Sequence, residues 1–260
     1  MSPRVGGAQV SSAPATSAAA ALSGRAAAWT GTGLSAVLWL VPFGSIALIP
    51  VRPYATIVHE GWHALVALLT GGQVDGVQLV AGGFGGGLAL ISGGWSLAIA
   101  AAGYLGSAVT GALWLRSLGR PRLLRGVLIA HAILMPLIAI VWSRTDFDAV
   151  LALLGLAALA AAAAKWLGRR SLQVICALLA LQLCLAALGD LQTLFAITTA
   201  TDAHSDAQLA AGITPIPAVV WAVVWGIGGL VAVFWGLRSA LGLPSLQAVR
   251  RRFSRRAAVS

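Results

Sequence analysis

The residues with the clearest chemistry in this sequence are two histidines and a glutamate in the run His59-Glu60-Gly61-Trp62-His63. On a helix, side chains four residues apart project from one face, so His59 and His63 can bind one Zn²⁺ with Glu60 beside it. Zinc lowers the pKa of a coordinated water toward ~7, and a carboxylate can take its proton during attack on a peptide carbonyl. The motif therefore predicts a zinc-activated water, with His59 and His63 as metal ligands and Glu60 as general base.

Coincidence is a poor explanation of this motif. Glu60 is the only glutamate in the chain, and it lies in an apolar segment, where an ionisable side chain costs at least ~2.5 kcal/mol. A shuffled sequence of the same composition would contain His-Glu-x-x-His only on the order of a few times in ten thousand. We therefore expect a metal site at these residues.

A third zinc ligand has to come from another part of the chain, because zinc usually takes three protein ligands and leaves one position for water. Asp190 is the first candidate, since it is a carboxylate well inside a later apolar run; the alternative is a helix-interior acid bonded to backbone or water. Asp206 is the runner-up, and the alternative there is a helix N-cap after a loop. We expect His204 to be an exposed loop residue and His131 a packing residue with one hydrogen bond.

The elements that position these residues must lie in a membrane. Hydrophobic residues make up 59% of the 260 residues and charged residues only 9%, which leaves too little polar surface for a soluble globule of this size. About seven apolar stretches are each near the ~20 residues that cross a hydrocarbon core. They run at about 33–51, 54–70, 95–115, 123–142, 147–166, 172–198 and 217–240.

Three regions are expected along the chain. Residues 1–28, rich in Ala, Ser and Gly, predict a disordered tail; residues 29–243 form the membrane domain; residues 244–260 form a basic tail. Within the domain, residues 73–92 alternate around a glycine run and predict a β-hairpin. The expected fold is all-α, a polytopic transmembrane bundle of about six to seven spans with a small glycine-rich hairpin after the His-Glu-x-x-His helix.

The net charge of +10 fixes an orientation rather than a nucleic-acid partner. Basic residues lie where short loops leave apolar runs, without the interleaved aromatic residues of a nucleic-acid surface. Loops rich in arginine face the cytoplasm, so we expect a multi-pass protein, in the plasma membrane, with a cytoplasmic C-terminal tail. The basic residues in question are Arg116, Arg120, Arg122, Arg125, Lys165, Arg169, Arg170, Arg250, Arg251, Arg252, Arg255 and Arg256.

Seven complete crossings conflict with one shared zinc. With a cytoplasmic C-terminal tail, the second span runs outward and places His59 about 10 Å above the inner face, whereas Asp190 lies about 27 Å above it. Reversing the second span removes the conflict only if residues 72–94 return to the outer face inside protein or a wet cavity. A sixth span that bends or starts outside the membrane also removes it, and the sequence leaves these alternatives open.

The sequence also resembles a known family, the site-2-protease-like intramembrane zinc metallopeptidases, in their short B-type branch without a PDZ domain. The resemblance covers roughly residues 34–240 and is most specific at His59-Glu60-Gly61-Trp62-His63-Ala64-Leu65. It continues at Thr70-Gly71-Gly72, Gly93-Gly94, Ala102-Gly103-Tyr104-Leu105-Gly106-Ser107, the Asp190 stretch, Ser205-Asp206-Ala207, Trp221 and Trp225-Gly226. It implies proteolysis of transmembrane protein substrates, zinc as cofactor and a distal aspartate as third ligand. In such proteins the hairpin can offer its edge to an unwound substrate. The family's Asp-Gly order is reversed here, as Gly189-Asp190.

Two other function classes compete with an intramembrane endopeptidase. A zinc-binding sensor or transporter would need several ionisable residues along a path through the membrane, and only Glu60, Asp190 and His131 lie deep in apolar runs. A catalytically inactive scaffold would keep the motif as a relic. The glutamate beside the metal favours hydrolysis, because a pure binding site needs no general base. Substrate and oligomeric state are open.

Overall fold

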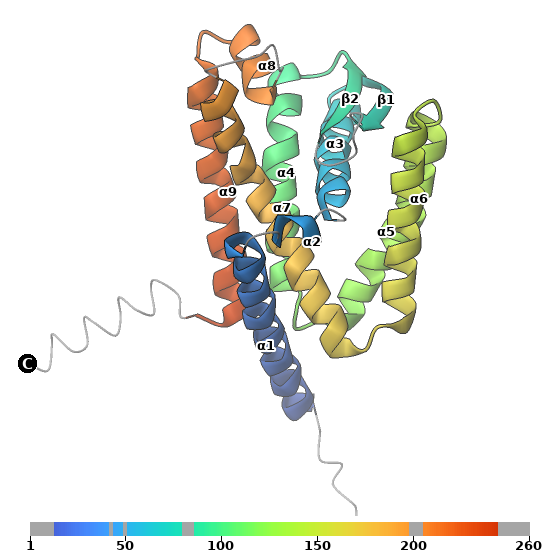
Figure 1. Ribbon diagram of the computed structural model, residues 1–260, viewed down its shortest axis with the longest axis vertical. Helices are drawn as coiled ribbons and strands as arrows, with labels where there is room; N and C mark the ends of the chain where they lie inside the picture. Colours follow the sequence, from blue (N-terminus) through green and yellow to red (C-terminus); the bar gives the residue numbers. More distant parts are fainter. Residues whose placement is uncertain (1–12, 42–43, 49–50, 80–85, 198–204, 244–260) are drawn as a thin grey trace, which may run out of the picture.

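The computed structural model describes residues 13–41, 44–48, 51–79, 86–197 and 205–243. In the helix that ends at residue 197, side chains are described only as far as Leu185. The elements form a mostly helical bundle with one two-stranded antiparallel hairpin at one end (Figure 1). In chain order they are α1 (Ala13–Leu40), α2 (Gly44–Ala47), α3 (Arg52–Leu69), β1 (Gln73–Leu79), β2 (Gly87–Ser92), α4 (Ser96–Arg116), α5 (Pro121–Trp142), α6 (Phe147–Trp166), α7 (Arg169–Ile197), α8 (Asp206–Ile213) and α9 (Ala218–Leu241).

Among the described residues, four helices are long and apolar enough to cross a membrane: α4, α5, α6 and α9. They have 20 to 24 residues, and 20 residues at about 1.5 Å each match a ~30 Å hydrocarbon core. Large apolar side chains such as Ile140, Leu151 and Val231 are exposed on them, as expected where lipid is the solvent. The chain is therefore a multi-pass integral membrane protein. The total of six to seven spans and the plasma membrane stay predictions.

Helix α1 runs parallel to α7. Near the start of both helices the Ser23 hydroxyl donates to Gln173 Oε1 at 2.5 Å, and further along Gln182 Nε2 donates to Ser35 Oγ at 2.9 Å. Gln173 Nε2 also donates to the Leu118 carbonyl, just after α4 ends, at 2.6 Å. Both helices therefore start at the end of the bundle where α4 finishes, and α1 rises only part of the way through it (Figure 1).

Helix α3 runs antiparallel to α4 and so in the same direction as α1. The backbone N–H of Trp95, just before α4, donates to Thr70 Oγ1 at the end of α3 over 3.1 Å. Near the other ends of the two helices the Tyr54 ring lies 6.2 Å from the Trp114 ring. Helices α1 and α3 therefore run in the same direction, and α3 lies nearer to the hairpin end of the bundle than α1 does (Figure 1).

This arrangement corrects two expectations about the N-terminal part. The spans expected at 33–51 and 54–70 are not two complete crossings in opposite directions, which removes the conflict over the height of His59. The disordered tail expected over residues 1–28 is wrong from Ala13 onward, because an alanine-rich segment has high helix propensity and buries Ala27 and Ala28. Residues 1–12 and the expected basic tail, 244–260, lie outside the described residues.

The hairpin expected at residues 73–92 is confirmed, with Val77 paired to Ala89 and Leu79 to Gly87. Alternate residues of an antiparallel pair turn their backbone groups away from the partner strand. On β1 these groups meet the turn between α5 and α6: Ser143 Oγ donates to the Val77 carbonyl at 2.7 Å, and the Leu79 N–H donates to an Asp146 carboxylate oxygen at 2.9 Å. The outer edge of β1 is therefore already occupied by this turn.

We expect Asp146→Ala to lower the stability of the fold by about 2 kcal/mol. The substitution removes both the N-cap of α6 and the acceptor for the Leu79 N–H at the edge of β1. The carboxylate caps α6 by accepting from the Ala149 N–H at 3.0 Å, and it also holds Leu79. Thermal unfolding in detergent measures the effect. Asp148→Ala is the matched control, because Asp148 is an exposed acid in the first turn of α6. Equal unfolding temperatures for the two variants would refute the anchoring role.

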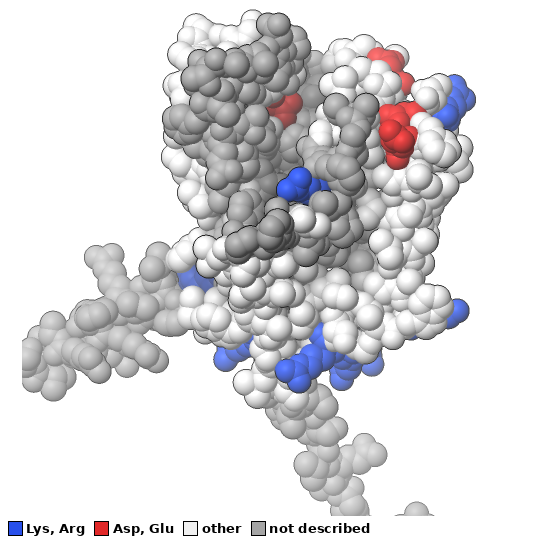
Figure 2. All heavy atoms as spheres, in the orientation of Figure 1, with Lys and Arg blue, Asp and Glu red and all other residues white. Residues whose placement is uncertain are grey.

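Charge separates along the bundle. Most of the visible lysine and arginine side chains gather at the end where α1 begins, and the visible acidic side chains lie toward the hairpin end (Figure 2). The turn between α4 and α5 contains Arg120, and α7 begins at Arg169, both at the basic end. Positively charged loops stay on the cytoplasmic side of a membrane, so this end is the expected cytoplasmic face.

Candidate metal centre

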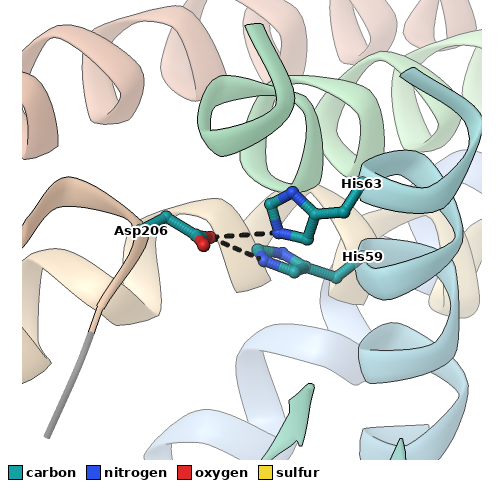
Figure 3. Close-up of side chains that lie close together, drawn as sticks. All are labelled: His59, His63 and Asp206. Atoms are coloured by element: carbon teal, nitrogen blue, oxygen red, sulfur yellow. Dashed lines mark hydrogen bonds and ion pairs between the residues drawn. The ribbon is translucent and has the colours of Figure 1, made fainter. Parts of the chain in front are cut away.

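Helix α3 places the two histidines of the motif together. His59 and His63 are one helical turn apart, and their ring centroids lie 4.7 Å apart with the planes near perpendicular, at 73°. The His63 side chain is buried, with 5% of the residue exposed. Both Nε2 atoms point to the same side, away from the α3 backbone (Figure 3).

Asp206, the first residue of α8, completes the group. One carboxylate oxygen, Oδ2, lies 3.1 Å from Nε2 of His59 and 3.1 Å from Nε2 of His63 (Figure 3). Ser205 is the N-cap of α8 and forms a capping box with Gln208. The alternative of Asp206 as the N-cap is therefore wrong, and its carboxylate is left to face the histidines.

The N-terminal part of α4 packs directly against the side chains of His59 and His63. A Cβ atom added at Gly103 would overlap Nε2 of both His59 and His63. Only glycine lets the α4 backbone lie this close to the imidazoles. Gly103 comes seven residues after Ser96, where α4 begins, so the site lies about 10 Å from that end of the helix.

The orientation of His63 is fixed by a second hydrogen bond. Its Nδ1 lies 2.6 Å from the Ile99 carbonyl oxygen on α4. A carbonyl oxygen can only accept, so Nδ1 carries the proton and a neutral His63 presents the lone pair of Nε2 to Asp206. This is the arrangement in which a metal-ligating histidine is normally held by an outer partner.

The donor set fits a cation. Two imidazole nitrogens converge on one carboxylate oxygen, and lone pairs at 3.1 Å repel unless a proton or a metal ion lies between them. Ligands at the ~2.0–2.1 Å bond lengths of tetrahedral zinc lie about 3.3 Å from one another, close to these separations. When protons occupy this place, burial raises the pKa of Asp206, but the hydrogen bonds and charges of the protonated imidazoles outweigh burial and lower its pKa to about 2. The carboxylate is therefore ionised and available as a ligand at neutral pH.

Glu60 is held beside this group by the hairpin. Only 7% of the residue is exposed, and its Oε2 accepts a hydrogen bond from the Ala89 backbone N–H at 2.8 Å. Gly87 on the same strand lies against it, since an added Cβ there would come within 3.0 Å of Glu60 Oε1. Strand β2 therefore positions the one carboxylate that the motif contributes besides the metal ligands.

A stack of aromatic rings lines the side of the site toward α9. The Tyr104 ring meets the His59 ring edge to face at a centroid distance of 4.5 Å, and it stacks on Trp225 at 5.8 Å. Trp225 in turn contacts Trp221, whose Nε1–H donates to Thr214 Oγ1 just after α8. The short helix that carries Asp206 is thereby packed on the same aromatic column that restrains His59.

The structure brings together three of the expected site residues, His59, His63 and Asp206, with Glu60 beside them. Asp190 lies on α7, but its side chain lies outside the described residues, as does His204, so the structure does not test the expectation that Asp190 is a ligand. His131 is away from the site, with Nδ1 donating to the Val127 carbonyl at 2.8 Å.

Sequence reasoning missed the backbone part of the site. The Ile99 carbonyl and the Ala89 N–H have no side-chain signature, because any residue supplies them. A glycine in an apolar helix, such as Gly103, indicates close helix packing and not a metal site. Gly106 does pack closely, against the Trp62 ring, while Trp62 Nε1–H donates to Thr110 Oγ1 at 2.9 Å.

An apolar bundle in which two histidines and a carboxylate converge defines a membrane protein with a candidate metal centre. The family model described as Peptidase M50B-like matches residues 27–236. The chain belongs to this family, in its site-2-protease-like branch, and membership implies a metallopeptidase, so the resemblance found in the sequence is confirmed. The comparisons with curated proteins and with solved structures gave no match.

Proposed function

We propose that this chain is an intramembrane zinc endopeptidase that hydrolyses peptide bonds of transmembrane protein substrates. The observation that carries the proposal is the convergence of His59 Nε2, His63 Nε2 and Asp206 Oδ2 over Gly103. Three protein ligands with a fourth position left for water are the usual set of a catalytic zinc site, whereas structural sites use four.

Each residue has a distinct task in the proposed reaction. His59, His63 and Asp206 hold the metal, and the Ile99 carbonyl keeps His63 in the ligating tautomer. Zinc, when bound, supplies a Lewis acid that polarises the substrate carbonyl and acidifies water. Glu60 accepts a proton from the attacking water and passes it to the leaving amine, as a general base that becomes a general acid.

Hydrolysis is favoured over zinc storage or transport by the position of Glu60. A site that only binds metal gains nothing from an ionisable group buried next to it, since burial of a charge is costly. Here a strand of the hairpin supplies a backbone donor to this carboxylate, at 2.8 Å. The fold thus supports a second carboxylate that is not needed to complete the three ligands.

The experiment that tests the proposal is elemental analysis of zinc in the purified full chain. We expect near-stoichiometric zinc in the wild type and in Glu60→Gln. Loss of one ligand exceeds the 10–100-fold cost of losing an outer partner, so His59→Ala and Asp206→Asn should lower zinc affinity by more than about 100-fold.

Asp190→Asn is the matched comparison for Asp206→Asn, because the two variants change one aspartate each to its neutral isostere. We expect Asp190→Asn to keep its zinc. Zinc lost from Asp190→Asn but kept in Asp206→Asn would make Asp190 the third ligand and overturn the assignment. A folded wild type that takes up no zinc when zinc is supplied would overturn the function itself.

A further inference from the structure

A cavity of about 640 Å³ opens at the basic end of the bundle, far from the metal centre. It lies between α1, the turn that joins α4 to α5, and the start of α7. Three arginine residues line it: Arg120, Arg122 and Arg169. These residues come from two separate places in the sequence, so the fold and not a local run of charge brings them together.

None of the acidic residues that the structure describes pairs with these arginines. The chain has seven acidic residues, and none lies in α1, in the turn before α5 or in the first half of α7. Within the part of the chain that the structure describes, none of the three arginines makes a salt bridge. Three like charges around one cavity repel each other, and a bound anion relieves this repulsion.

Other arginines near this end are used differently. The Arg116 guanidinium lies 4.1 Å from the centroid of the Trp235 ring. Arg125 donates to the carbonyl oxygens of Ala164 and Leu167, where α6 ends. Both therefore serve packing or helix capping, whereas the three cavity arginines contact none of the described groups in this way and point to a ligand.

The frame around the cavity suits an anion. Arg120 precedes α5 without capping it through a side chain, and Arg169 is the first residue of α7, so two helix N-termini with their partial positive charge border the space. The Gln173 side chain at the cavity is 1% exposed and is already fixed by Ser23 and the Leu118 carbonyl. The Ser23 and Gln173 side chains at the cavity are thus hydrogen-bonded to protein, whereas the three arginines are exposed and have no acidic partner among the described residues.

We propose that this cavity binds the phosphate headgroup of an anionic phospholipid of the cytoplasmic leaflet. A lipid fits better than a soluble phosphate for two reasons. The cavity lies where transmembrane helices end, at the depth of headgroups, and basic pockets at this level take anionic lipids. Its wall also includes Ala19 and Ala20 of α1, and Leu123, next to Arg122, is 45% exposed on the outer face of α5, where an acyl chain can lie.

The test uses the full chain in detergent and native mass spectrometry to measure binding of phosphatidylglycerol, phosphatidylcholine and inorganic phosphate. A hydrogen bond to a charged group contributes about 1.5 kcal/mol or more, so Arg120→Gln, Arg122→Gln and Arg169→Gln should each weaken phosphatidylglycerol about tenfold. Arg170→Gln is the matched control, on the same helix but outside the cavity, and should change binding less than about twofold.

Ala20→Phe gives an independent test, since it places a bulky side chain in the cavity and keeps every charge. We expect it to weaken phosphatidylglycerol as strongly as the arginine variants, and size-exclusion profiles identify variants that do not fold. Equal effects of Arg169→Gln and Arg170→Gln would reduce the cavity to general surface charge, and equal binding of both lipids would show that the headgroup charge is not recognised. Displacement of the lipid by millimolar inorganic phosphate would replace it with a soluble anion. Each of these results overturns the proposal.

Discussion

Glu60→Gln is expected to reduce peptide-bond hydrolysis by roughly 10²–10⁴-fold, the usual contribution of a general base, while zinc stays bound. Glutamine keeps the size of the side chain, and its carbonyl oxygen can still accept from the Ala89 N–H, so the change removes basicity and little else. The measurement is the cleavage rate of a quenched fluorogenic peptide containing one glycine-rich transmembrane segment, with purified enzyme in detergent.

Zinc content separates this result from a folding defect. A Glu60→Gln protein that is inactive and zinc-loaded supports the base, whereas an inactive protein without zinc indicates that Glu60 acts on metal binding instead. Retention of more than about a tenth of the wild-type rate would rule out general-base catalysis by this residue, because it corresponds to less than ~1.4 kcal/mol of barrier.

Gly103→Ala is expected to abolish stoichiometric zinc binding without touching a ligand. The added methyl group would overlap Nε2 of both His59 and His63, the atoms that have to face the metal. The two imidazoles must turn away or α3 must shift from α4, and a close-packed interface resists such a shift. The readout is zinc per chain, together with the unfolding temperature.

Two glycines provide matched controls for this substitution. Gly126 in α5 and Gly155 in α6 are helical glycines with no atom within 4 Å of an added Cβ. Alanine at either position should keep zinc and stabilise the helix by up to about 1 kcal/mol. A wild-type zinc content in Gly103→Ala would contradict this prediction and show that α3 and α4 can move apart far enough to accommodate the methyl group.

The His-Glu-x-x-His motif and the hairpin could be predicted from the sequence because each has a short local signature. The depth at which the first two apolar segments lie in the membrane could not be predicted in this way. Hydropathy measures the length of an apolar stretch, but not its direction or where it begins in the membrane. The direction of α1 depends on contacts between residues far apart in the sequence, such as the hydrogen bond between Ser35 and Gln182.

The ranking of the third ligand shows a similar limit. Asp190 was favoured because an acid inside an apolar run is costly and needs a reason. The capping box of Ser205 and Gln208 is a local pattern that could have freed Asp206 from a capping role. What no pattern could supply is that α8 packs against α4 and α9 and so brings Asp206 over Gly103.

The common direction of α1 and α3 also decides at which end of the bundle α9 finishes. After these two helices α4 descends, α5 rises, α6 descends, α7 rises and α9 descends, so the start of α1 and the end of α9 lie at the same end of the bundle (Figure 1). Gly242, which ends α9, accordingly lies against the Arg25 side chain of α1. The two ends of the described chain therefore lie on the same side of the bundle. One span more or fewer would move the end of α9, with Arg238 in its last turn, to the opposite side, where the positive-inside rule disfavours it.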